Sequence, residues 1–244
     1  MQRNRLTLMA AVLAGAGLAL SAVSASAAPV TSFATTPVAA DGQNGLDAIA
    51  DDATLAGRVL NLMKVDVGGN DWTNSAVRIV LTTGTIYNSS NATGTADAPN
   101  AALWGIPTLR NGRYDSFINS KGLGGTPDNN PQSATLLGTL NADGSPGPLP
   151  AVGLTPNPPD QLVSVQWGNL VGGETGIFSV GRFTLSANAT GTFIGLTQDS
   201  ASAGVITTFN GNIVGGAMVL VPEPASLGLL GLAAIGLLRR RRAL

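Results

Sequence analysis

Carboxylates are the side chains of this sequence that could carry out acid–base chemistry. Between the two chain ends there are one glutamate, Glu174, and twelve aspartates. Two carboxyl groups suffice to hydrolyse a glycosidic bond, so Glu174 and an aspartate are one candidate catalytic pair. However, Asp51 and Asp52 form the only adjacent pair, and most aspartates stand near Gly, Asn or Pro, where Asp commonly forms turns. We therefore predict that the chain is not an enzyme, and polysaccharide cleavage is the least favoured alternative.

The sequence contains no histidine and no cysteine. A Ser-His-Asp triad, a cysteine nucleophile and an imidazole base are therefore excluded. Zinc and copper sites depend on the same two residue types and are excluded as well. No disulfide can form, so the fold must be held by its own hydrophobic core.

Calcium is the one metal that the remaining oxygen ligands could hold. The best cluster is Asp41, Asn44 and Asp47 around two glycines, and Asn141 with Asp143 forms a second. Neither cluster matches the Asp-x-Asp-x-Asp-Gly loop of a calcium site. We expect Asx turns at both, with a stabilising Ca²⁺ as the alternative, and we expect no other cofactor.

Tryptophan rings could stack on sugar rings. Trp72 and Trp104 lie in loop-like, Gly-containing contexts and are the possible glycan contacts, whereas Trp167 lies in a strand pattern and is expected in the core. Only 5% of the residues are aromatic, so the core needs most of them.

Short runs of alternating apolar and polar residues predict β-strands. The clear runs are residues 58–67, 76–83, 162–167, 176–185, 192–197, 205–209 and 213–221, and weaker runs are 85–87, 114–118 and 135–140. A bulge is expected at Gly181, where the buried face changes. Residues 47–56 predict one short helix. The pattern indicates an all-β, antiparallel β-sandwich, jelly-roll-like, with long Gly-, Pro- and Asn-rich loops at 88–111, 119–132 and 141–160.

The N-terminal residues have the three parts of a secretory signal peptide. Arg3 and Arg5 precede an apolar run over residues 6–20, and Ala25-Ser26-Ala27 follows. Ala25 and Ala27 are the small residues of an A-x-A cleavage site, so we expect signal peptidase to cut after Ala27. The body of the protein would then cover residues 28–221 and lie outside the cytoplasm.

The C-terminal residues predict a membrane segment. Residues 225–238 are uncharged and apolar on every side of a helix, and Arg239, Arg240, Arg241 and Arg242 follow. Arginine clusters remain cytoplasmic, so they act as the stop-transfer and topology signal and leave the body outside. Pro222 and Pro224 prevent the helix from extending toward the body.

Residues 222–244 resemble the PEP-CTERM sorting signal of Gram-negative bacteria. Pro222, Glu223 and Pro224 form the motif, and the apolar helix and the arginine cluster follow in the family's order. The resemblance covers about a tenth of the chain. It implies recognition by an exosortase, a membrane-embedded cysteine transpeptidase that cuts near the motif, and production alongside exopolysaccharide and biofilm matrix. A plain C-terminal membrane anchor is the alternative.

The charge of the body limits its partners. Seven of the 13 basic residues lie between the chain ends, against thirteen acidic residues, so the net charge of the body is about −6. Nucleic acid is excluded as a partner because no basic patch is available to bind phosphates.

These observations predict a non-enzymatic protein that is transiently anchored in the inner membrane and then reaches the cell surface or the extracellular matrix. Its expected partners are signal peptidase, an exosortase-like transpeptidase and exopolysaccharide. A carbohydrate-binding module that holds exopolysaccharide through Trp72 and Trp104 is the alternative.

Overall fold

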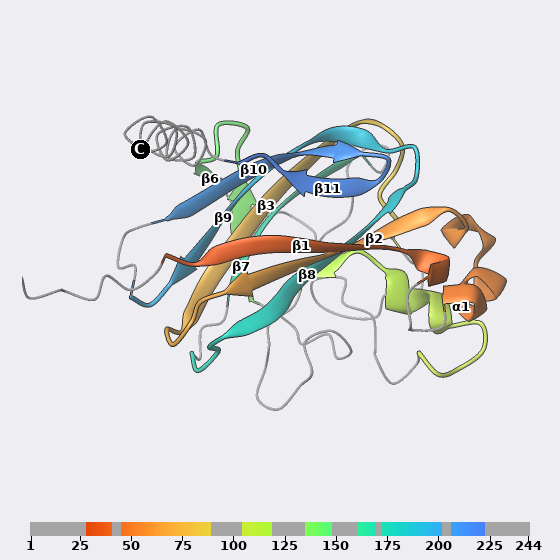
Figure 1. Cartoon of the computed structure of the whole chain (residues 1–244), viewed down its shortest axis with the longest axis horizontal. Coiled ribbons are helices and arrows are strands. Elements are labelled where there is room, and N and C mark those ends of the chain that lie inside the picture. The colour runs from red at the N-terminus through yellow and green to blue at the C-terminus, as the bar shows by residue number, and fades with distance from the viewer. Residues whose placement is uncertain are drawn as a thin grey trace, which may run out of the picture.

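The chain folds mainly into antiparallel β-strands in a computed structural model (Figure 1). The structure describes residues 28–40, 45–88, 104–118, 135–147, 161–168, 172–201 and 206–222. Within these ranges eleven strands form two sheets. The all-β expectation is confirmed. The expected signal peptide over 1–27, the membrane helix over 225–238 and Arg239 to Arg242 lie outside the described residues.

The smaller sheet has the strand order β1-β2-β8-β4. Its strands are β1 (Val30–Pro37), β2 (Arg58–Asp66), β8 (Ile177–Ser186) and β4 (Phe117–Ile118). β1 and β2 pair over their full lengths, and the first pair is Val30 with Asp66. β1 is a sheet edge that the sequence did not predict.

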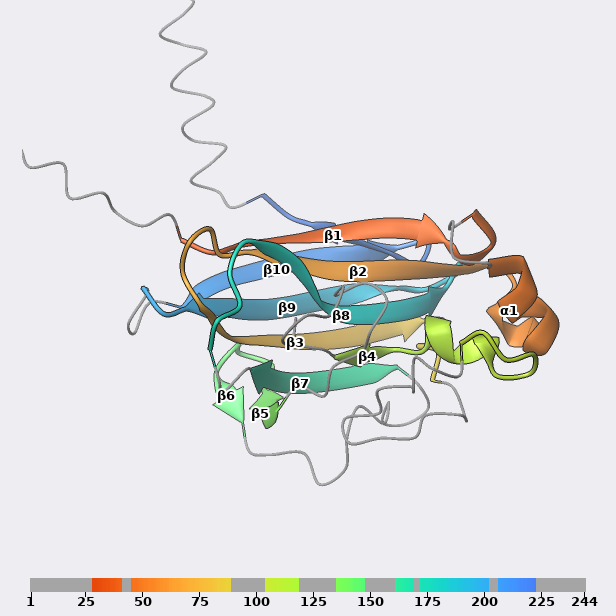
Figure 2. The same cartoon turned by 90° about the horizontal axis from the view of Figure 1, so that it is seen from below.

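The larger sheet has the order β11-β10-β9-β3-β7-β5-β6. Its strands are β3 (Trp72–Thr83), β5 (Thr135–Leu140), β6 (Pro146–Gly147), β7 (Leu162–Gly168), β9 (Thr190–Asp199), β10 (Thr207–Val214) and β11 (Ala217–Leu220). β3 and β9 lie at its centre, and β11 forms one edge. Figure 2 shows β1, β2 and β8 lying over β10, β9 and β3.

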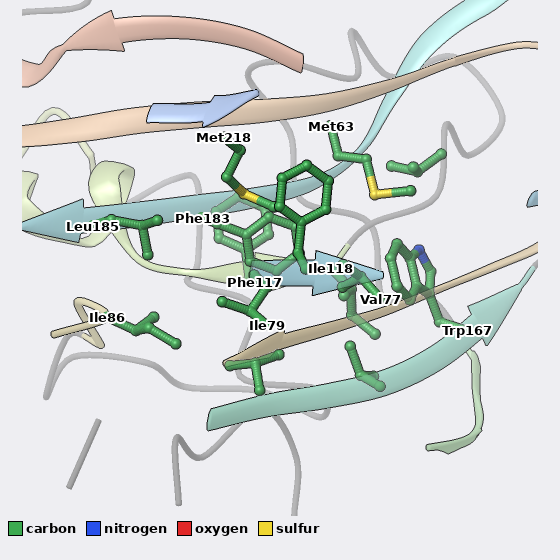
Figure 3. Packing of buried hydrophobic residues seen from close by; sticks show 14 of the residues in the cluster. Met63, Val77, Ile79, Ile86, Phe117, Ile118, Trp167, Phe183, Leu185 and Met218 are labelled. Atoms are coloured by element: carbon green, nitrogen blue, oxygen red, sulfur yellow. The ribbon is translucent and has the colours of Figure 1, made fainter. Parts of the chain in front are cut away.

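One hydrophobic cluster takes side chains from both sheets. Met63 of β2 and Phe183 of β8 contribute from the smaller sheet, and Val77 of β3 and Trp167 of β7 from the larger one (Figure 3). All four are completely buried. The inward members of the alternating runs therefore fill the space between the sheets, as the period-2 pattern requires. Burial of this apolar surface is the main term that stabilises a cysteine-free fold.

The sequence-predicted strands are largely present, with several corrections. The run 85–87 forms only an isolated bridge from Ile86 to Leu185, the run 114–118 is a strand only at β4, and β6 lies within the predicted loop 141–160. The predicted strand at 213–221 is wrong, because the chain reverses at Gly215 and Gly216 between β10 and β11. Both glycines have positive φ, +58° and +78°, which a two-residue hairpin of this hand needs. The bulge expected at Gly181 is present: Met63 pairs with Gly181 and Lys64 with Ser179, which leaves Val180 as the extra residue.

The helical residues lie at one end of the sheets. α1 (Gly45–Asp51) is followed by the 3-10 turn η2 (Ala53–Leu55), so the single helix expected over 47–56 is divided. Asp52 causes the division, because its Oδ1 accepts a hydrogen bond from the Thr54 backbone N–H at 2.9 Å and caps the new turn. The 3-10 helix η5 (Arg110–Tyr114) packs beside α1, as does the short 3-10 turn η1 (Val38–Ala40) that follows β1.

Candidate functional site

The last strand of the body leads directly into the predicted sorting motif. β11 ends at Leu220, and the Val221 backbone N–H still donates to the Asn210 carbonyl of β10 at 3.0 Å. Pro222 is exposed and is the last described residue, so Glu223 and Pro224 lie outside the described ranges. No linker therefore separates the sheet from the motif. Proline has no N–H, and so it cannot continue the hydrogen bonding of the strand.

A buried asparagine in the other sheet fixes the start of β11. Asn61 of β2 is fully buried. Its Oδ1 accepts a hydrogen bond from the Met218 backbone N–H at 2.9 Å, and its Nδ2 donates to the Gly216 carbonyl at 2.8 Å. The same amide contacts both neighbouring strands, through Thr35 Oγ1 at 3.0 Å and the Phe183 carbonyl at 3.2 Å. The edge hairpin is thus hydrogen-bonded to the opposite sheet as well as to β9.

The outer side of β9, β10 and β11 carries a set of exposed, uncharged polar side chains, which we call the Thr/Asn face. Its exposed members on β9 and β10 are Thr190, Thr192, Thr208, Asn210 and Asn212. Apolar side chains lie among them, namely Ile194, Leu196, Val214 and Val219. Asn212 pairs with Thr192 on one side and with Val219 on the other, so the row continues across all three strands. The sequence signal for this face is the alternation Thr208, Asn210, Asn212, which sequence reasoning did not use.

The two tryptophans expected to contact glycan are buried. Trp72 is the first residue of β3 and not a loop residue, and 0% of it is exposed. Its Nε1 donates to Ser75 Oγ at 3.0 Å, and its ring meets Phe178 edge-on at 5.8 Å. Trp104 is 5% exposed and lies beneath the guanidinium groups of Arg113 and Arg182. Neither ring offers a face to a sugar, so this expectation is corrected.

The candidate acidic residues Glu174, Asp51 and Asp52 have structural surroundings. Glu174 is buried, 3% exposed, and its backbone carbonyl accepts from the Trp72 N–H at 2.8 Å. The two adjacent aspartates have different partners: Asp51 Oδ1 accepts from Arg110 Nη2 at 2.7 Å, while Asp52 Oδ2 accepts from the Tyr87 hydroxyl at 2.6 Å. The Arg110 hydrogen bonds hold the pKa of Asp51 well below its usual range.

The pKa of Tyr87 is shifted in the opposite direction to that of Asp51. Burial, and then the hydrogen bond to Asp52, raise the pKa of the Tyr87 hydroxyl above its ordinary value. Asn111 Nδ2 also donates to this oxygen, at 3.1 Å. The phenol therefore stays protonated at all physiological pH values and joins η2 to η5 as a structural donor.

The expected calcium clusters give no support for a metal site. Asp41 and Asn44 lie outside the described residues, and Asp47 of α1 is 3.6 Å from the Arg110 guanidinium. At the second cluster, Asp143 Oδ1 accepts hydrogen bonds from the Ser145 N–H at 2.9 Å and from the Ser145 hydroxyl at 2.6 Å. This is an ordinary Asx turn. Within the described ranges, no three acidic residues come together as a metal site.

For the expected signal-peptidase site and the expected membrane helix, only neighbouring residues are described. Ala25 and Ala27 lie outside the described residues, and Ala28, the first residue of the expected mature chain, is exposed. Within the described ranges, none of the helices has the length and apolar character needed to cross a membrane.

Comparison with known proteins supports the C-terminal resemblance. The family model described as the PEP-CTERM protein-sorting motif matches residues 220–242. The match begins inside β11, at Leu220, and extends through Arg242. Comparisons with curated proteins and with solved structures gave no match for any part of the chain. The motif implies an exported protein that is processed by an exosortase. The chain thus carries a PEP-CTERM sorting motif at its C-terminus, and this motif continues directly from the edge strand of an all-β body.

Proposed function

We propose that the processed protein is a non-catalytic component of the cell surface or extracellular matrix, with a jelly-roll-like β-sandwich body that adheres to exopolysaccharide. The Thr/Asn face is the single observation that carries this proposal. The sorting motif supports the location, since it implies export and exosortase processing. The inner membrane would hold the protein only until the tail is cut.

The Thr/Asn face has suitable chemistry for a polysaccharide. Hydroxyl and amide groups both donate and accept hydrogen bonds, as sugar hydroxyls do. Neighbouring strands lie about 4.8 Å apart, so Thr192 and Asn212 present their polar groups side by side, next to the exposed aliphatic Val219. No charged side chain occurs in β10 or β11, and Asp199, the only one in β9, is buried. Many weak contacts of this kind suit adhesion to a repetitive polymer.

Two other functions have less support. A carbohydrate-binding module that stacks sugars on Trp72 and Trp104 would need exposed rings, and both rings are buried. A polysaccharide-cleaving enzyme would need Glu174 and a second carboxylate in an open cleft. Glu174 is buried, and Asp51 and Asp52 are bound to Arg110 and Tyr87.

Co-sedimentation tests the proposal. The mature protein, purified from the host medium or surface, is mixed with exopolysaccharide from the same host and pelleted. We expect the double variant Asn210→Ala/Asn212→Ala to lower the bound fraction several-fold. Asn188→Ala, an exposed asparagine in the turn before β9, is the matched control and should bind as the unaltered protein does. Equal binding by all three proteins would refute adhesion through the Thr/Asn face.

A further inference from the structure

β1 starts at the end of the body that is away from α1, and β11 points toward that end (Figure 1). Thr31 Oγ1 of β1 is 3.0 Å from Thr197 Oγ1 of β9, and Thr197 pairs with Thr207, the first residue of β10. Because β11 runs antiparallel to β10, it returns toward that same end. It stops short of it, because Leu220 pairs with Gly211 and Val221 bonds to Asn210, so Pro222 leaves the sheet beside the middle of β10. The opposite end carries α1 and the Gly215–Gly216 turn.

The tether between the sheet and the apolar stretch is very short. Val221 is hydrogen-bonded to Asn210, and only Pro222, Glu223 and Pro224 precede Ala225. At a maximum of about 3.6 Å per residue, the four steps from Val221 to Ala225 reach about 14 Å. The headgroup layer on each side of a bilayer takes up roughly 5–7 Å of this distance. A body attached in this way must stay close to the lipid surface.

The end of the body that is away from α1 has exposed apolar side chains around its rim. Val30 and Ile177, 59% and 69% exposed, are aligned on either side of Asp66, which pairs with both. On the larger sheet, Ile206 and Val221 are 45% and 42% exposed. We call these four residues the apolar rim. Single exposed aliphatic residues are ordinary, and Leu46 and Val214 at the opposite end are as exposed; the apolar rim differs from them in its position near the tether.

Backbone hydrogen bonds make this end rigid. The Gly176 N–H donates to the Gly68 carbonyl at 2.7 Å, and the Ser200 N–H donates to the Asp71 carbonyl at 2.8 Å. The loops after β2, before β8 and after β9 are therefore joined into one platform. Among the described residues of this platform (28–31, 66–72, 172–178, 197–201, 206–208 and 221–222) there is no Lys or Arg. Attraction to anionic lipid therefore cannot be its source of affinity.

We propose that the apolar rim rests on the lipid headgroups of the inner membrane for as long as the tail is uncut. This inference rests on the proposed sorting route, in which residues 225–238 enter the membrane. The short tether keeps the body close to the bilayer, the end away from α1 faces it, and Val30 and Ile177 on one sheet and Ile206 and Val221 on the other become shielded from water. Removal of the tail releases the rim.

Single labelled cysteines test this contact without background, because the chain has no cysteine of its own. Val30→Cys and Ile177→Cys place an environment-sensitive fluorophore on the rim. Leu46→Cys and Val214→Cys, 71% and 64% exposed, place it at the opposite end as matched controls. The full chain is reconstituted into vesicles of phosphatidylethanolamine with a minority of phosphatidylglycerol, and some lipids carry a headgroup quencher. Thermal unfolding must first show that the four variants are folded.

We expect several-fold stronger quenching at Val30→Cys and Ile177→Cys than at the two controls, and no weakening when salt is added. Two results would overturn the proposal. The first is equal quenching at both ends, and the second is no quenching at the rim in chains that float with the vesicles. The second result would leave the membrane tail intact and indicate that the rim serves another partner, such as the processing enzyme. Chains that fail to float would show that residues 225–238 do not insert, and the sorting route would fail with the rim contact. Adhesion of the mature protein to exopolysaccharide is measured separately and is unaffected by either failure.

Discussion

Asn61 and Met218 are joined by a hydrogen bond between the two sheets. The Met218 N–H donates to Asn61 Oδ1 at 2.9 Å, although Asn61 lies in β2 and Met218 in the edge strand β11. The Met218 side chain is buried in the cluster that Met63 and Phe183 also join (Figure 3). This pair therefore couples the position of the sorting motif to the core, because only three residues separate Met218 from Pro222.

Replacing this asparagine should destabilise the body. Asn61→Ala would leave the Met218 N–H and the Gly216 carbonyl without their side-chain partner in a buried position, which we expect to cost about 2–4 kcal/mol of unfolding free energy. Urea unfolding of the mature protein measures the change. Asn212→Ala, an exposed asparagine, is the control and should shift stability by less than about 0.5 kcal/mol. Similar losses in the two variants would contradict the assigned role of Asn61.

Gly211 of β10 should not tolerate a side chain. A Cβ at this position would lie 2.2 Å from Phe193 Cζ and 2.3 Å from the Val219 carbonyl oxygen. Phe193 is fixed in turn by edge-on contacts with Phe33 at 5.0 Å, so its ring has little room to move. We expect Gly211→Ala to lower the free energy of unfolding by about 1–3 kcal/mol. Gly69→Ala, with nothing within 4 Å of the new Cβ, should be close to neutral, and thermal unfolding compares the two.

The Asp51–Arg110 ion pair should make stability depend on pH. Arg110 lowers the pKa of Asp51 in the folded state, so the pair stabilises the fold above the ordinary aspartate value of about 4 and loses this effect as the pH falls below it. We expect Arg110→Met to be less stable than the unaltered protein at neutral pH, with the difference shrinking as the pH falls from about 5 to 2. Urea midpoints at several pH values measure this. A difference that stays constant with pH would show that the pair is not its source.

Glu223 should be needed for removal of the tail. We expect Glu223→Ala to cross the inner membrane normally and to retain the residues up to Leu244, including the arginine cluster Arg239 to Arg242. Intact mass and cell fractionation in the native host measure both effects. Asn188→Ala, far from the motif in sequence, should be processed as the unaltered chain is. Normal cleavage of the Glu223→Ala chain would refute its role in recognition.

Local pattern was sufficient to predict most of the sheet strands. β2 and β7 were predicted within a residue of their observed bounds, because apolar and polar residues alternate along them. β1 was missed because Val30–Pro37 holds only two large apolar residues, and it is a strand because β2 offers it a complete partner. The hairpin at Gly215–Gly216 was missed although paired glycines are a turn signal.

Of the candidate site, only the part formed by consecutive residues, the sorting motif, could be predicted from the sequence. The sorting motif needs no fold to be recognised, and the family match agrees with it. The burial of Trp72 was not foreseeable, since the residues Gly-Gly-Asn-Asp before it are typical of a loop. Asn61 gave no signal either: a single polar residue between Leu60 and Leu62 acquires its role only when β11 is placed against it.

The direct exit from β11 also decides how the body responds to mechanical force. The tail begins where the strand ends, so a pull on Pro222 along the strand axis loads the hydrogen bonds between β10 and β11 together, in shear, rather than one after another. The bond from Met218 to Asn61 shares that load with the opposite sheet. A pull in this direction is therefore resisted by these hydrogen bonds together, and the last strand is not peeled from its sheet one bond at a time.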